Sequence, residues 1–241
     1  MATEGGQMQG ALLGTGPVWI LALDASLARC SAAVLADGQV RASRALDTER
    51  GHAAALPPMA AAVLAEAGIK AEDLDAVAAV VGPGGFTGLR AAIALAQGIA
   101  LGAGLPVIGV TTGEALLAAL PEQQRAGSAV WSAVDNRRGR VVLERFAPGA
   151  MAPLGLPEVF ALDALPAPPS RLTLVGDAAP ALADALRDSG ADLLLSDSRL
   201  PDAGAAARVA ALRLAGRLPP LAARPLYVEP PAVRLPADAA G

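Results

Sequence analysis

The order of apolar segments is repeated along the chain of 241 residues, and this repeat restricts the fold more than any other feature. The first round opens with three short β-type segments, two of which flank Asp37-Gly38, a dipeptide that favours a β-hairpin. Helical and strand patterns then alternate as far as Leu120. A shorter second round opens with a strand segment that ends in Asp135, as the first segment ends in Asp24. The order βββαβα, followed by a shorter second round, predicts an α/β fold of two related lobes with a smaller, degenerate second lobe.

The bounds of these elements follow from the apolar patterns. In the first round we expect strands at 19–24, 31–36, 39–46, 76–81 and 105–111, and helices at 52–67, 87–103 and 114–120. In the second we expect strands at 129–135, 140–146, 172–177 and 191–195, and helices at 179–189 and 203–216. The N-terminal lobe is therefore placed at 18–121, and the C-terminal lobe, with its Pro-rich tail, at 122–241. Residues 1–17 are Gly-rich without a basic start, so a disordered leader is expected rather than a signal peptide.

The charge balance and the rare residue types exclude several classes of protein. A net charge of −4 is opposite to the basic surface of a protein that binds nucleic acid by itself. Cys30 is the only cysteine, which excludes an internal disulfide and favours a cytoplasmic location. His52 is the only histidine, so a multi-histidine zinc site is excluded and no bound metal is expected. The longest apolar segment, 91–105, is shorter than a bilayer span, so no membrane segment is expected.

The stretch GPGGFTGLR, residues 82–90, joins a strand to a helix, where free backbone amides can bind an anion. It lacks the Lys-Ser or Lys-Thr of a Walker A loop and does not match G-x-G-x-x-G. Two interpretations stay open: a remnant of a nucleotide loop, or a turn whose glycines let strand and helix pack closely. The same choice applies to Asp24 and Ser26, which either join that site or cap their own turn. The candidate nucleotide or anion site comprises Asp24, Ser26, Gly82, Gly84, Gly85 and Thr87.

The helix that follows this loop has small residues on almost every face. In water such a helix must be covered all round, either by the core or by a partner. Thr87 is expected as its N-cap. Arg90 then falls in the first turn, where the helix dipole disfavours a cation, so a partner carboxylate or an anion is expected beside it. The charged stretch 135–140 is expected to be a solvated hairpin turn.

Several segments together resemble the TsaB family, formerly called YeaZ. They are LALDAS, the Asp-Gly hairpin, GHAAALPPM, VVGPGGFTGLR with AQGIALG, LPVIGVT, AVDNRRGRVV and RPLYVEPP, which span nearly all of residues 18–236. GPGGFTGLR is the most specific of them, although the family usually has serine where this chain has Gly85. The resemblance implies two RNase-H-like lobes of the actin-like ATPase fold, which agrees with the βββαβα pattern.

The resemblance also implies a role in forming N6-threonylcarbamoyladenosine at position 37 of tRNAs that read ANN codons. TsaB is the non-catalytic partner of its paralogue TsaD, which transfers the threonylcarbamoyl group, and an ATPase, TsaE, joins the pair. TsaD-type chains carry a metal-binding H-x-x-x-H pair within a segment resembling V-N-H-x-E-A-H. At those two positions this chain has Thr112 and Leu116, and leucine cannot ligate a metal. We therefore expect an accessory subunit that is not an enzyme and needs no cofactor, contacts tRNA only within the complex, and leaves weak nucleotide binding at the partner interface open.

The partner surface implied by the resemblance lies on the helices of the first lobe. The expected interface residues are Leu56, Met59, Ala60, Val63, Arg90, Ala91, Ala94, Leu95, Gln97, Gly98 and Leu101. The same face could instead pair two copies of this chain when TsaD is absent. Two other hypotheses remain: an independent ATPase or kinase of the actin-like class, with Asp24, residues 82–88 and Asp177 lining a cleft, and a metallopeptidase, which a single histidine disfavours.

Overall fold

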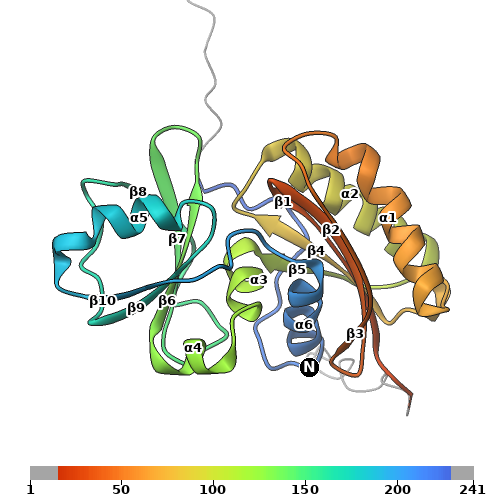
Figure 1. Ribbon diagram of the computed structural model, residues 1–241. Coiled ribbons are helices and arrows are strands. Elements are labelled where there is room, and N and C mark those ends of the chain that lie inside the picture. Colours follow the sequence, from red (N-terminus) through yellow and green to blue (C-terminus); the bar gives the residue numbers. More distant parts are fainter. Residues whose placement is uncertain (1–15, 229–241) are drawn as a thin grey trace, which may run out of the picture.

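The structure, a computed structural model, describes residues 16–228, which form two lobes side by side (Figure 1). Each lobe is built on a five-stranded sheet. The first has the order β3-β2-β1-β4-β5, and the second has the order β8-β7-β6-β9-β10 when counted from its matching edge. The first sheet consists of β1 (Trp19–Leu27), β2 (Arg29–Ala36), β3 (Gln39–Asp47), β4 (Ala76–Gly82) and β5 (Val107–Thr111). The second consists of β6 (Ala129–Asp135), β7 (Arg140–Phe146), β8 (Glu158–Ala161), β9 (Arg171–Val175) and β10 (Asp192–Leu195). The two orders correspond strand for strand, which confirms the expected pair of related lobes.

Helices cover both faces of the first sheet. The helices and 3-10 turns are α1 (His52–Ala67), η1 (Ala71–Asp73), α2 (Phe86–Ala103), α3 (Thr112–Ala118), α4 (Glu122–Gly127), α5 (Ala179–Ala185), η2 (Arg187–Ser189) and α6 (Ala203–Leu214). Helices α1 and α2 pack side by side on the outer face, and α6 packs on the face toward the second lobe (Figure 1). Strand β4 is therefore buried on both faces, and its sequence is a continuous apolar run for that reason.

Four local features differ from the expectations. Strand β1 continues to Leu27, through residues expected as a turn, because its pairing with β2 resumes after an irregularity. Helix α2 begins at Phe86 with Gly85 as its N-cap, so Thr87 already lies inside the helix. Two elements occur where none was expected: β8 in the segment 147–169, and α4 between the last strand of the first sheet and the first strand of the second. The smaller second lobe was expected, and its size is explained because no element of the described chain between β8 and β9 corresponds to α1.

The two lobes exchange a helix. Helix α3 follows β5 of the first sheet, but its Leu116 and Leu117 pack with Phe146 of the second lobe. Helix α6 follows β10 of the second sheet, but its alanines pack beneath β1 and β4 of the first, with Ile20 and Val80. The expected division at residue 121 separates the two sheets, yet α6 belongs to the core of the first lobe. Its run of small side chains permits this close approach to the sheet.

The exchanged helices are joined by a buried ion pair. Glu114 of α3 is fully buried, and Arg213 of α6 is 6% exposed. Arg213 Nη2 donates to Glu114 Oε1 at 2.6 Å and Nη1 donates to Oε2 at 3.1 Å, a bidentate arrangement. Glu114 Oε2 also accepts from the backbone N–H of Thr111, which closes a capping box at the start of α3. Each charge is therefore compensated inside the joint between the lobes.

The C-terminal strap, residues 219–228, returns along the first lobe and bends at residues 223–224. The N–H of Gly109 donates to Leu221 O, and the N–H of Leu226 donates to Val81 O, both at 2.8 Å. Ala222 forms a bridge with Ile108, so the strap partly covers the edge of β5. The rest of the expected Pro-rich tail, 229–241, and the expected leader up to residue 15 lie outside the described residues.

We predict that Arg213→Met lowers the free energy of unfolding by about 3–5 kcal/mol, because it leaves the carboxylate of Glu114 buried without its cation. The control is Arg208→Met, at an exposed position of the same helix, which should change stability by less than about 0.5 kcal/mol. Urea denaturation followed by circular dichroism measures both variants. Equal stabilities for the two would show that the ion pair does not hold the lobes together.

Candidate functional site

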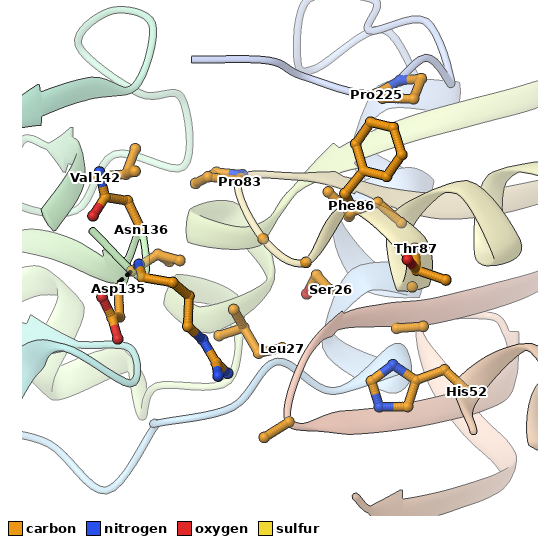
Figure 2. Close-up of a pocket in the computed structure, with 18 of the residues that line it drawn as sticks. Ser26, Leu27, His52, Pro83, Phe86, Thr87, Asp135, Asn136, Val142 and Pro225 are labelled. Atoms are coloured by element: carbon orange, nitrogen blue, oxygen red, sulfur yellow. Dashed lines mark hydrogen bonds between the residues drawn. The ribbon is translucent and has the colours of Figure 1, made fainter. Parts of the chain in front are cut away.

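A cleft of about 1050 Å³ lies between the lobes. The first lobe lines it with the end of β1, the start of α1 and the loop that leads into α2. The second lobe contributes the turn after β6 and the side chains of Val142 and Asp177, and the strap closes one end with residues 225–228. Figure 2 shows Ser26, Pro83 and Phe86 facing Asp135 and Asn136 across this space. Because it lies at the matching ends of β1 and β6, this cleft is the candidate site of the fold.

The glycines of GPGGFTGLR pack directly against the end of β1. The N–H of Gly85 donates to Ser26 O at 2.7 Å. A Cβ on Gly84 would lie 2.2 Å from Ser26 O, and a Cβ on Gly88 would lie 2.0 Å from Ala25 O. Real Cβ atoms do not approach an oxygen so closely, so both positions require glycine. These contacts support the interpretation of the loop as a turn that packs strand and helix closely. The Gly85 N–H is bonded to Ser26 O, so it is not available to an anion.

Position 85 itself is not crowded. A Cβ there would lie 3.6 Å from Ser26 O, an ordinary contact, and the backbone of Gly85 is extended. The serine usual at this position in the TsaB family would therefore fit without a shift of the backbone.

Ser26 lines the cleft, whereas Asp24, two residues earlier in β1, is not part of its lining. Both side chains are buried, and Asp24 Oδ1 accepts the N–H of Ser26 at 3.0 Å, as in a turn capped by its own aspartate. Burial raises the pKa of Asp24 to about 6. Above that pH the carboxylate repels an anion, so the capping role accounts for these two residues better than phosphate binding does.

The matching aspartate of the second lobe has a different environment. Asp135 ends β6 at the place where Asp24 lies in β1, but its side chain is exposed. Its Oδ1 accepts from the N–H of Arg137 at 2.8 Å, and its own N–H donates to Asp177 Oδ1 at 3.0 Å. Burial raises the pKa of Asp177. The turn expected at 135–140 is present, and Asp135 together with Asp177, from the segment after β9, accepts N–H groups of its backbone.

The expected partner-interface residues divide into three groups: buried, half-buried and exposed. Leu56, Ala60 and Val63 are at most 2% exposed and pack inside the first lobe, so a partner cannot touch them in this conformation. Their spacing of four and three residues is that of a core-facing stripe, and this signal could have assigned them to the core. Met59, Ala91 and Leu95 are half-buried. The residues exposed on α2 are Arg90, Ala94, Gln97, Gly98 and Leu101.

The outer face of α2 is uncharged apart from Arg90. Leu101 is 86% exposed, and Gly98 and Ala94 lie one and two turns before it on the same side. By length and composition alone α2 could cross a membrane, but Leu89, Ile93 and their neighbours bury its other side against the sheet. The exposed face is therefore a flat apolar strip on a folded α/β lobe.

Two residues near Arg90 were not expected as site residues. The Arg90 guanidinium lies 3.7 Å from the ring centroid of Phe86, and its Nε and Nη2 donate to Tyr227 Oη at 3.1 and 2.9 Å. Phe86 and Tyr227 are 56% and 53% exposed. A carboxylate or an anion was expected beside Arg90, and the described residues provide no carboxylate there. The link between Arg90 and Tyr227 spans 137 positions, so no local pattern in the sequence could reveal it.

The segment that would hold a metal in a TsaD-type chain does not fit one here. Thr112 is buried and its hydroxyl donates to Pro83 O at 2.6 Å, and Leu116 lies in the apolar cluster between α3 and the second sheet. Among the described residues no group of three His, Cys, Asp or Glu side chains could bind a metal ion. His52 lies in the cleft wall and its Nε2 is 2.7 Å from Thr48 O, which occupies that nitrogen.

Glu144 of β7 is a second buried carboxyl group beside this segment, which itself contains Glu114. Its Oε1 accepts from the Thr111 hydroxyl at 2.9 Å, and a Cβ on Gly113 would lie 2.2 Å from its Oε2. Burial, with a smaller effect of the nearby Glu114 charge, raises the pKa of Glu144 to about 8. The group is therefore protonated at neutral pH, and its closeness to the backbone explains why position 113 is glycine.

Comparisons with known proteins connect this geometry to two related families. Residues 46–149 match the family model of TsaD, tRNA N6-adenosine threonylcarbamoyltransferase. The chain is 40% identical over 122 residues to the tRNA threonylcarbamoyladenosine biosynthesis protein TsaB of Escherichia coli K12, covering 51% of this chain and 52% of that protein. The alignment thus spans about half the length of this curated relative.

Two solved structures from Pseudomonas aeruginosa extend the similarity to whole chains. One is described as an uncharacterized protein with similarity to peptidase YEAZ, with a TM-score of 0.71, 30% identity, and coverage of 88% of this chain and 100% of that chain. The other, described as YeaZ, has a TM-score of 0.72 and 28% identity, with 86% and 100% coverage. The expected two-lobe actin-like fold is confirmed by these likenesses.

We predict that Gly88→Ala lowers the free energy of unfolding by about 3 kcal/mol, because the new methyl group forces α2 away from Ala25 O. Gly98→Ala in the same helix is the control. A Cβ at Gly98 meets nothing within 4 Å, so this variant should gain up to about 1 kcal/mol from helix propensity. Thermal denaturation compares the two, and a Gly88→Ala variant as stable as Gly98→Ala would contradict the close packing of the loop.

We also predict a loss of stability with rising pH that depends on Glu144. Its pKa is about 8 in the folded chain and 4.5 in the reference state, so the folded state keeps a proton that the unfolded state has lost. The free energy of unfolding should then fall as pH rises through this window. The contribution of Asp24 to this pH dependence ends near pH 6. Between pH 6 and 8 the free energy of unfolding should therefore fall by on the order of 2 kcal/mol because of Glu144.

The variant Glu144→Gln should remove most of that fall, whereas Glu72→Gln, at an exposed position, should leave it unchanged. Denaturant titrations at pH 6, 7 and 8 measure the effect. A slope in Glu144→Gln equal to that of the wild type would rule out Glu144 as its source.

Proposed function

The chain belongs to the TsaB (YeaZ) family, and from this premise we propose that it is a non-catalytic subunit of the complex that forms N6-threonylcarbamoyladenosine at position 37 of ANN-decoding tRNAs. Its partner is a TsaD-type transferase, and the TsaE ATPase joins the pair in the cytoplasm. The chain activates TsaD by binding it, and it meets tRNA only as part of the assembled complex.

The uncharged outer face of α2 is the observation on which the partnership rests most directly. Ala94, Gly98 and Leu101 form an apolar strip that its own lobe leaves exposed, and small side chains let a second helix approach closely. The match to the TsaD family model over residues 46–149 supports the view that partner and chain are paralogues. The first lobe of this chain can then pair with the matching lobe of TsaD, each through the two helices that are α1 and α2 in this chain.

The absence of catalysis in this chain is supported by the chemistry of its own residues. Thr112 and Leu116 replace the histidine pair of a transferase, and both side chains are engaged in internal contacts. The same residues disfavour a peptidase, although a solved relative is described as similar to peptidase YEAZ. No cofactor is needed for a subunit of this kind, and any weak nucleotide binding is expected where the two subunits meet.

An independent ATPase or kinase is the alternative. The cleft between the lobes favours it, but the loop glycines are packed against β1 and Asp24 is buried beneath them. Isothermal titration with ATP and Mg²⁺, together with a turnover assay on the isolated chain, distinguishes the two. Tight binding with turnover would support the ATPase in place of the accessory subunit.

We predict that Ala94→Glu weakens association with the TsaD-type partner at least about tenfold, because it places an unpaired charge on the apolar strip. Ala126→Glu, at an exposed position of α4 in the second lobe, is the matched control and should bind as the wild type does. Binding is measured by titration calorimetry, and modification of tRNA is assayed with and without the chain.

Two results would contradict the proposal. Wild-type affinity of Ala94→Glu would exclude the α2 face as the interface. Full modification activity of TsaD and TsaE without this chain would exclude its role as an activator.

A further inference from the structure

Resting on the proposed function, we propose that the strap is part of the partner-binding surface and that Tyr227 holds Arg90 ready to bind a carboxylate of the partner protein. This extends the surface from α2 alone to α2 together with residues 219–228. It also identifies the chemistry expected of the partner: an acidic side chain at the end of α2 nearest the cleft, beside an apolar helical face.

The strap and the outer face of α2 are connected at two points. Gln97 Nε2 donates to Ala223 O at 3.0 Å, and Arg90 donates to Tyr227 Oη. Positions 90 and 97 are two helical turns apart, so both contacts lie along one side of the helix. A protein seated on the exposed strip of α2 would therefore also meet the strap that borders it.

The charge of Arg90 is not neutralised among the described residues. It is the only charged residue of α2, and the groups in contact with it are a neutral hydroxyl and the Phe86 ring. Arg90 is the fifth residue of α2, beyond the first turn, so it is this unneutralised charge and not the helix dipole that calls for a partner. The position therefore gains from a negative charge that the described chain does not provide.

The geometry leaves one edge of the guanidinium available. Arginine has five N–H donors, and Tyr227 Oη accepts from Nε and from Nη2 on one edge. The opposite edge, formed by Nη1 and the second Nη2 hydrogen, has the spacing that receives a carboxylate through two parallel hydrogen bonds. Because Phe86 and Tyr227 fix the plane of the group, little rotamer freedom is lost on binding.

The residue types in this cluster are those that dominate protein interfaces. The chain has only three phenylalanines, two tryptophans and one tyrosine, yet Phe86 and Tyr227 both lie more than half exposed beside the same arginine. Tyrosine and arginine are enriched among residues whose loss weakens a complex most. A protein carboxylate fits this surface better than an RNA phosphate, because the strip beside it is apolar rather than basic.

The test measures the affinity of full-length variants for the TsaD-type partner by titration calorimetry. Arg90→Glu should weaken binding about 10- to 100-fold, since it sets two negative charges against each other. Tyr227→Phe keeps the ring and removes only the hydroxyl, and should weaken binding about three- to tenfold. Arg208→Glu, on the helix that covers the opposite face of the first sheet, makes the same charge change and should have no effect.

The outcomes separate this inference from the proposed function. If Ala94→Glu weakens the complex but Arg90→Glu and Tyr227→Phe bind as the wild type does, the strap and its arginine are not part of the interface. If Arg90→Glu leaves partner binding unchanged but reduces tRNA binding by the assembled complex, the guanidinium binds phosphate and the inference is overturned. A wild-type chain that does not bind the partner would refute the proposed function itself.

Discussion

The ion pair between Glu114 and Arg213 is the contact on which the two-lobe arrangement depends. It joins α3 to α6, the two helices that the lobes exchange, at a point from which water is excluded. A buried pair is not in itself a strong source of stability, because both charges lose their hydration. Its importance lies in specificity: once buried, either charge without the other is costly, so only the arrangement that brings α3 and α6 together is tolerated. The Thr111 capping box and the Arg213 bond to Gly109 O fix the directions of both partners.

The cleft is a consequence of that joint and of the glycines on one of its walls. The exchanged helices hold the ends of β1 and β6 opposite each other, and the loop before α2 then fits against β1 only because Gly84 and Gly88 have no side chain. In this chain the Gly85 amide of the loop donates to Ser26 O, and Asp24 and Asp135 at the strand ends each accept a backbone N–H through Oδ1. The fold has kept the cleft of an actin-like protein, while its polar groups maintain the shape of the walls.

Much of this architecture could be predicted from the sequence because its signals are local. The Asp37-Gly38 turn, the continuous apolar run of β4 and the glycine that ends α1 each depend on neighbouring residues. The features that could not be predicted depend on contacts between distant segments. Nothing near α6 indicates that its alanines pack under the first sheet, and nothing near Arg90 indicates a tyrosine 137 positions away. The error at Leu56, Ala60 and Val63 had another cause: the resemblance placed them on the partner surface, although their spacing of four and three residues is that of a core-facing stripe.

The strap also connects the buried ion pair between the lobes to the outer face of α2 through a series of hydrogen bonds. Arg213, which binds Glu114, donates through Nε to Pro219 O at the start of the strap, at 2.7 Å. The strap then bonds to β5, Gln97 and Arg90 in turn along its length. A change that loosens α6 must therefore release the first residue that holds the strap, and a partner that orders Tyr227 must restrict the strap from its other end. Arg213 of the buried ion pair and the exposed Arg90 are in this way connected by one short stretch of chain, whose prolines leave it few other conformations.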